Sequence, residues 1–85
     1  MKQTTIPESV IPVLLKAQKN EITEYHIYNR LADTVKDQHN SDLLRKIGND
    51  EKSHYELWKK YTGMEVKPSR LRIFKFYWIS RIFGL

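Results

Sequence analysis

The sequence contains no cysteine among its 85 residues. This absence excludes disulfide bonds, thiolate metal sites and catalysis by a cysteine nucleophile. Glycine is also scarce, with three residues, and none of them belongs to a glycine-rich phosphate-binding loop. Classical hydrolase and nucleotide-binding functions therefore have no support in the sequence. Because nothing in the composition requires an oxidising compartment, we expect a cytoplasmic protein, or one at the cytoplasmic face of a membrane.

Acidic residues are almost missing from the last third of the chain. Residues 59–85 contain seven Lys or Arg and one Glu, whereas residues 1–58 contain eight basic and nine acidic residues. The net charge of +5 therefore comes from the C-terminal segment. The same segment also holds a group of large aromatic residues, Phe74, Phe76, Tyr77, Trp78 and Phe83. Basic residues mixed with large apolar ones favour a membrane surface or a partner helix, and we expect no nucleic acid partner.

The length allows one small domain, whose core would need a metal or a second subunit for stability. Apolar residues recur at helical spacing over about residues 10–36, 41–62 and 70–85. The loop between the first two segments is short, so these helices must be antiparallel. The sequence therefore predicts an all-α helical hairpin followed by a third, C-terminal helical segment.

Capping residues mark the expected ends of these helices. Ser9 can cap the first helix, Asn40 or Ser41 the second, and Ser69 the third. Gly63 is expected to end the second helix in a left-handed conformation.

A polar pair interrupts the apolar pattern of the second helical segment. Glu51 and His54 are three residues apart, so both face one side of a helix and can bind a single metal ion. They lie on a predicted buried line that also contains Leu44, Ile47, Trp58 and Tyr61. A buried carboxylate needs a cationic partner, because burial without one costs several kcal/mol. The pattern indicates either a metal site or an ion pair between Glu51 and His54 at the rim of a core.

Glu21 occupies an equivalent place on the predicted buried line of the first helix. At ~1.5 Å per residue, Glu21 lies roughly 22–27 Å from the loop, and the Glu51 and His54 pair roughly 14–20 Å. These distances from the loop differ by about one helical turn, so Glu24 remains a competing ligand. Tyr28 is on the same line, where its hydroxyl could donate to a metal-bound carboxylate or simply lie at the edge of the core.

The two helices together provide half of a known type of di-metal site. A ferritin-like di-iron site uses one Glu on each of two helices and a Glu-x-x-His motif on each of the other two. This chain has one of each, so a two-fold homodimer would supply the full set and close a four-helix bundle. Carboxylates combined with imidazole favour iron, with manganese as the alternative, over zinc or calcium.

Two stretches carry a resemblance to a known family. Residues 20–28 read NEITEYHIY and residues 47–54 read IGNDEKSH, and together they resemble the first half of a rubrerythrin-type, ferritin-like domain. The resemblance covers about residues 12–85. The sequence is especially similar to the rubrerythrin-type domain that precedes the membrane part of vacuolar-iron-transporter-like proteins. In that resemblance, residues 77–85 would lead into a third helix.

The resemblance also implies roles for individual residues. It implies that Glu21 and His54 are terminal iron ligands, that Glu51 bridges two irons, and that Tyr28 hydrogen-bonds to a ligand. The second half of the family's helical pattern and its rubredoxin-type cysteine module are not in this sequence. The implied chemistry is therefore ferroxidase-type oxidation of Fe(II) by O₂ or peroxide, or the sensing and transfer of iron in iron homeostasis.

The third segment, which begins at Arg70 and ends at Leu85, supports a competing hypothesis. It is too short and too charged to span a membrane, and too apolar for a solvated tail. Because the sequence stops inside this apolar run, we expect either a fragment of a longer protein or a segment that a partner covers. In the competing hypothesis, the protein is a non-enzymatic module that docks on an anionic membrane or a partner helix through this segment.

Overall fold

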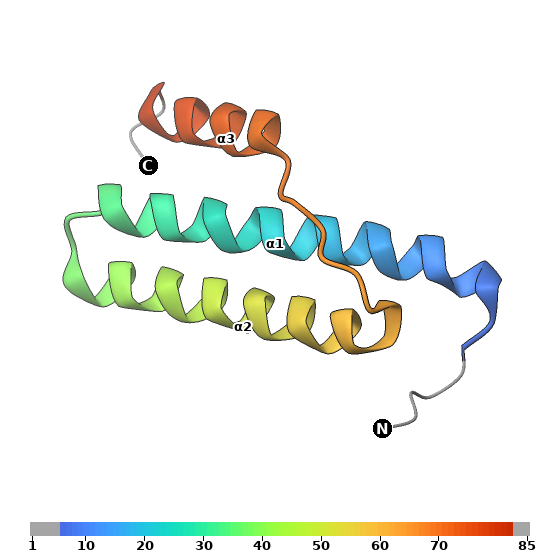
Figure 1. Cartoon of the computed structure of the whole chain (residues 1–85). Helices are drawn as coiled ribbons and strands as arrows, with labels where there is room; N and C mark the ends of the chain where they lie inside the picture. Colours follow the sequence, from blue (N-terminus) through green and yellow to red (C-terminus); the bar gives the residue numbers. More distant parts are fainter. Residues whose placement is uncertain (1–5, 83–85) are drawn as a thin grey trace.

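The computed structural model describes residues 6–82, and the regular structure in this range is entirely helical (Figure 1). A short 3₁₀ helix, η1 (Glu8–Val10), leads into α1 (Ile11–Thr34), which is followed by α2 (Gln38–Thr62) and α3 (Arg70–Ile82). The predicted all-α class is confirmed. The last part of the predicted third helix, residues 83–85, lies outside the described residues.

The start of α1 differs from the expectation. Ser9 lies inside η1, and no side chain caps α1. Pro12 stands in the first turn of α1. Because proline has no N–H, one of the groups that a cap would satisfy is missing there.

The start of α2 also corrects the expected cap. The helix begins earlier than predicted because Asp37 is its N-cap, and the Asp37 carboxylate accepts a hydrogen bond from the backbone N–H of Asn40 at 3.0 Å. Ser41 is buried inside the helix instead, where its hydroxyl donates to the carbonyl oxygen of Ala32 at 2.8 Å. The hydroxyl expected to cap α2 thus joins α2 to α1.

The other two predicted end signals are confirmed. Gly63 ends α2 with a φ of 68°, in the left-handed region that glycine tolerates. The Ser69 hydroxyl accepts a hydrogen bond from the backbone N–H of Arg72 at 3.3 Å, as an N-cap side chain does.

The helices lie side by side in one layer, with α1 between α2 and α3 (Figure 1). The Cα positions extend over 46 × 24 × 14 Å, so the shortest dimension is well below the other two. A single layer can enclose few side chains. Within residues 6–82, the buried apolar residues are accordingly few: Ile22, Ile27, Ala32, Tyr55 and Ile73.

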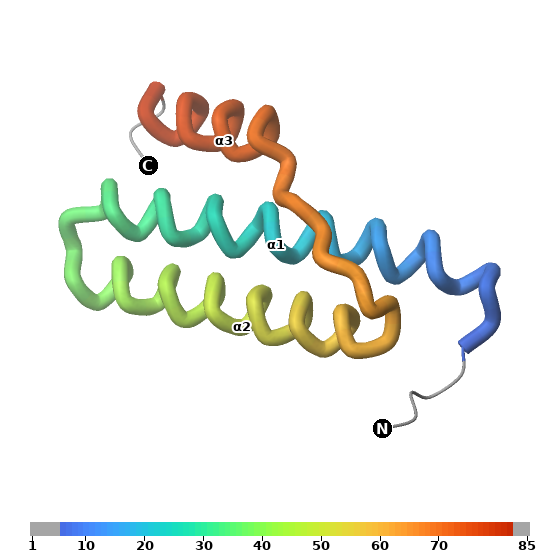
Figure 2. The backbone as a smooth tube through the Cα atoms, viewed as in Figure 1, coloured from blue at the N-terminus to red at the C-terminus, as the bar shows by residue number. Residues whose placement is uncertain are grey.

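The connection between α2 and α3 crosses over α1 (Figure 2). Two fully buried polar side chains of α1, Gln18 and Thr23, hold this connection. Gln18 donates to the carbonyl oxygen of Met64 at 2.8 Å, and the Thr23 hydroxyl accepts from the N–H of Ser69 at 2.9 Å. These bonds place α3 beside the C-terminal half of α1.

The contact line of α2 against α1 runs one residue away from the predicted one. The buried residues of α2 are Ser41, Gly48 and Tyr55, whereas the predicted line passed through Ile47 and His54. Gly48 causes this shift, because a Cβ there would lie 3.2 Å from the Cβ of Tyr28. The missing side chain lets the two helices approach closely on that line.

The expected difference in height between Glu21 and Glu51 is absent. Glu21 lies thirteen residues before Thr34, where α1 ends, and Glu51 lies thirteen residues after Gln38, where α2 begins. At ~1.5 Å per residue, both are roughly 20 Å from the loop. The predicted offset came from placing both helix ends too late in the sequence, by two residues at the end of α1 and by three at the start of α2.

Among the described helices, none is long and apolar enough to cross a membrane.

We predict that Gly48→Val destabilises the fold by about 2 kcal/mol, because the new side chain must push α1 and α2 apart. Urea unfolding at one fixed protein concentration measures this loss. Asn49→Val is the matched control, since it places the same side chain at an exposed neighbouring position of α2, where we expect a change below about 0.5 kcal/mol. Equal losses for both variants would contradict the role of close helix approach.

Candidate metal centre

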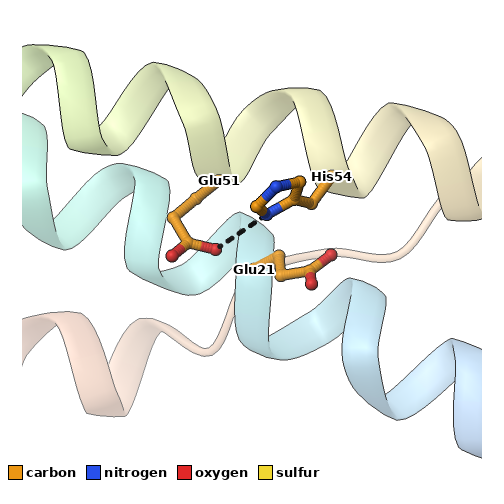
Figure 3. Close-up of side chains that lie close together, drawn as sticks. All are labelled: Glu21, Glu51 and His54. Carbon is orange, nitrogen blue, oxygen red and sulfur yellow. Dashed lines mark ion pairs between the residues drawn. The ribbon is translucent and has the colours of Figure 1, made fainter.

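Three of the predicted site residues come together between α1 and α2. Glu21, Glu51 and His54 each offer one ligand atom, and these atoms all lie within 4.8 Å of one another. Figure 3 shows Glu51 and His54 on α2 beside Glu21 on α1. The geometry is therefore compact enough for the three side chains to bind a common cation.

The helical spacing of α2 sets the positions of two of these side chains. Nδ1 of His54 lies 3.8 Å from Oε1 of Glu51 (Figure 3), and the side chains are 57% and 22% exposed, respectively. The expectation that both would be buried is thus wrong for His54. Because Gly48 and Tyr55 face α1, His54 points toward one open side of the layer.

Trp58 holds the carboxylate of Glu21, a role that the sequence pattern did not suggest. Its indole Nε1–H donates to Oε2 of Glu21 at 3.3 Å. The other oxygen, Oε1, is buried and has no hydrogen-bond partner among the described residues. A buried acceptor without a partner costs about 1–3 kcal/mol, and a bound cation would remove this cost. The residues present therefore fit a metal ion.

Burial raises the pKa of Glu21, while the Trp58 hydrogen bond and the nearby His54 lower it and the Glu24 carboxylate raises it. The pKa of Glu24 is also raised, first by burial and then by the Glu51 carboxylate, and Arg72 opposes this rise. Both pKa values are raised because burial and neighbouring carboxylates disfavour the ionised form. A divalent cation would favour the ionised form of each carboxylate.

Glu24, the competing ligand, is not one of the three grouped residues. Its carboxylate lies beside that of Glu51, and its Oε2 is 3.9 Å from Nη2 of Arg72 on α3. Sequence reasoning missed Arg72, because no local pattern signals a contact between helices that are distant in the sequence. Trp58 could have been found, since it stands seven residues after Glu51, on the same side of α2.

Tyr28 lies half-buried where α1 meets α2, with its Cβ next to Gly48. Within residues 6–82, Glu21 receives its side-chain hydrogen bond from Trp58 and none from Tyr28. The ligand-bonding role of Tyr28 remains a prediction.

A helical hairpin with carboxylates and an imidazole between its two helices is typical of the ferritin-like class of carboxylate metal proteins. The family model of rubrerythrin matches residues 2–62, which is most of the chain. The chain therefore belongs to the rubrerythrin family.

Family membership indicates iron binding by carboxylates at a di-iron centre, and the grouped Glu and His residues provide suitable ligands. No curated protein sequence matches the chain, and no solved structure does so either.

We predict that metal binding quenches the fluorescence of Trp58, because its indole is hydrogen-bonded to a carboxylate of the site. Trp58 and Trp78 are the two tryptophans of the sequence, so Trp78→Phe isolates the Trp58 signal. Anaerobic titration with Fe(II) should quench this variant and leave the emission of Trp58→Phe unchanged. If only the Trp78 signal responds, the metal is bound elsewhere.

Proposed function

We propose that the protein binds iron through Glu21, Glu51 and His54 and oxidises Fe(II) with O₂ or peroxide. The main support is the grouping of these three ligand atoms within 4.8 Å in a chain of the rubrerythrin family. The two carboxylates carry negative charge that favours the higher oxidation state, and His54 adds a neutral nitrogen ligand. Each Fe(II) would give up one electron, so two irons would reduce one O₂ to hydrogen peroxide, or one hydrogen peroxide to water, with two protons from solvent.

The other residues of the site position its ligands. Trp58 donates to one oxygen of Glu21, and the other, the buried Oε1, has no hydrogen-bond partner among the described residues and is available to a cation. Gly48 keeps α1 and α2 close enough for Glu21 to reach the other two ligands. Sensing iron or transferring it to another protein would use the same residues, so this role is an alternative outcome of the same site.

We further propose that a second copy of the chain completes the centre as a two-fold homodimer. Three ligands form half of a ferritin-like di-iron site. The side of α2 that carries His54 also carries Leu43, Ile47, Leu57 and Tyr61, which recur at helical spacing from it. Leu43 and Leu57 are exposed, so a second copy placed on this face would cover His54 and these apolar side chains together.

We predict that Glu51→Ala and His54→Ala each weaken Fe(II) binding by more than about 100-fold, since loss of a group that only orients a ligand already costs up to that much. The measurement is anaerobic titration of the purified chain. Glu56→Ala and His39→Ala are the matched controls, because both residues are exposed on α2 and neither is in the ligand group. Binding that survives both ligand substitutions would contradict the assignment.

Molecular mass and metal content, measured on the same samples, test the dimer separately. A shared centre gives two irons per dimer, and metal should strengthen dimerisation because each subunit supplies half of the ligands. A metal-loaded monomer that persists at high protein concentration would contradict the dimer but not the ligand assignment.

A second candidate function concerns α3, and we propose that it docks on an anionic membrane surface. Arg70, Arg72, Lys75 and Arg81 are its charged residues, and it has no acidic one. On the side away from the buried Ile73 and Ser80, α3 presents an apolar stripe of Leu71, Phe74, Trp78 and Ile82, which are 64%, 60%, 48% and 71% exposed. An apolar stripe with flanking basic residues suits the boundary between anionic headgroups and acyl chains.

A cavity beside the stripe strengthens this proposal. It has a volume of about 400 Å³ and lies between α1 and α3, with Arg30 and Arg70 at its wall and Phe74 and Tyr77 among its lining residues. A lipid headgroup is the anion that would meet both this basic cavity and the adjacent apolar stripe. A second copy is a poorer occupant, because its own α3 carries the same positive charges.

We predict that the protein binds vesicles containing phosphatidylglycerol, does not bind pure phosphatidylcholine vesicles, and is released by salt. Arg70→Gln/Arg81→Gln should weaken binding by about 30-fold, from ~1 kcal/mol per basic residue. Lys46→Gln/Lys60→Gln removes equal charge from exposed positions of α2 and serves as the control. Equal losses of vesicle binding for both pairs of substitutions would contradict membrane docking. It would also be contradicted if the protein does not bind vesicles and instead forms a dimer that is lost when Trp78 is replaced.

A further inference from the structure

A guanidinium group of α3 reaches one carboxylate beside the candidate metal centre. Nη2 of Arg72 lies 3.9 Å from Oε2 of Glu24, and its Nη1 donates to Oδ1 of Asn20 at 2.8 Å. The side chains of the ion pair are 38% and 39% exposed, so water screens the pair only in part. The first turn of α3 is therefore electrostatically connected to the site.

The attachment of α3 to α1 fixes Arg72 in this place. The backbone N–H of Ser69 donates to the buried Thr23 hydroxyl at 2.9 Å, and the Ser69 hydroxyl accepts from the N–H of Arg72 at 3.3 Å. Thr23 directly precedes Glu24, so one short stretch of α1 anchors α3 and carries the carboxylate that Arg72 contacts. Movement of α3 away from α1 would separate Arg72 from Glu24.

Burial and the negative charge of Glu51 raise the pKa of Glu24, and the Arg72 guanidinium at 3.9 Å opposes this rise. Within the described part of the chain, Arg72 is the single Lys or Arg that comes within ion-pairing distance of Glu21, Glu24 or Glu51. A divalent metal bound to Glu51 would be a second cation next to the same carboxylate. Glu24 can then pair with the guanidinium or join the metal ligands.

We infer that Glu24 is a reserve metal ligand held by Arg72, so that attachment of α3 to α1 and metal binding oppose each other. This inference rests on the metal site proposed above. Arg72 is a positioning residue, since it acts on the metal through Glu24. Metal binding draws Glu24 from Arg72 and loosens α3, and by reciprocity the docked α3 weakens metal binding by the same factor.

Removal of the guanidinium tests the inference in the full chain. Arg72→Gln should tighten anaerobic Fe(II) binding by about two- to fivefold, the range expected for a partly exposed ion pair. Arg70→Gln removes the same charge from an exposed position two residues earlier, where the side chain lines the cavity between α1 and α3 and is not ion-paired with Glu24. This control should leave the affinity close to that of the wild type, and Arg72→Lys, which keeps the charge, should do the same.

The Glu24→Gln background separates the reserve-ligand role from a general effect of charge. If Arg72 acts by holding Glu24, Arg72→Gln tightens metal binding in the wild-type background and not in Glu24→Gln. Tightening of equal size in both backgrounds would mean that Arg72 acts on the metal through space, and would overturn the inference.

Hydrogen exchange provides a readout that does not depend on affinity. The N–H of Ile73 is hydrogen-bonded to the carbonyl oxygen of Ser69, and metal should speed exchange of this and neighbouring amides of α3 in the wild type but not in Glu24→Gln. Unchanged exchange on metal binding would overturn the inference even if Arg72→Gln folds poorly.

If the wild type binds iron through Glu51 and His54 and Arg72→Gln matches Arg70→Gln, only this inference fails. If no variant binds iron, the proposed function fails with it.

Discussion

The close approach of α1 and α2 at Gly48 is the constraint on which the geometry of the site depends. A Cβ at this position would lie 3.2 Å from the Cβ of Tyr28 and 3.4 Å from the carbonyl oxygen of Tyr25, so a larger residue would separate the helices. Close approach selects the line of α2 that faces α1 and thereby rotates His54 to one side. With Glu21 and Glu51 at equal distances from the loop, their side chains meet across this contact.

The convergence of carboxylates creates an electrostatic cost that the neighbouring side chains offset in different ways. Glu21 receives an indole hydrogen bond from Trp58, Glu51 lies beside the imidazole of His54, and Glu24 lies beside the guanidinium of Arg72. These partners do not remove the cost, since the pKa values of Glu21 and Glu24 remain raised, with burial as the largest cause for both. One oxygen of Glu21 also stays without a donor among the described residues. The site is thus short of positive charge, which is the condition under which a metal ion binds carboxylates strongly.

The sequence predicted the elements of this fold better than their contacts. Helix periodicity and the end signals at Gly63 and Ser69 depend on local chemistry, so they could be read directly. The contact line of α2 could not, because apolar spacing marked the stripe through Ile47 and His54 while the absent side chain of Gly48 decided the packing. The sequence predicted that Glu21 and Glu51 lie on facing lines, but it put them about one turn apart because the helix ends were misplaced. The Arg72 contact depends on how the connection crosses α1, which no local pattern shows.

The single layer explains why the site is sheltered on one side and open on the other. Oε1 of Glu21 is buried between α1 and α2, while His54, the third ligand, remains more than half exposed at 57%. A metal held by these residues would therefore be accessible from the face that carries His54. Because apolar side chains occupy the same face of α2, any layer that covers them also closes the metal site. A layer that covers this face would bury apolar side chains together with the ligands, and a bound metal would offset the charge of the buried carboxylates. Metal binding would therefore favour covering of the face, and covering would favour metal binding.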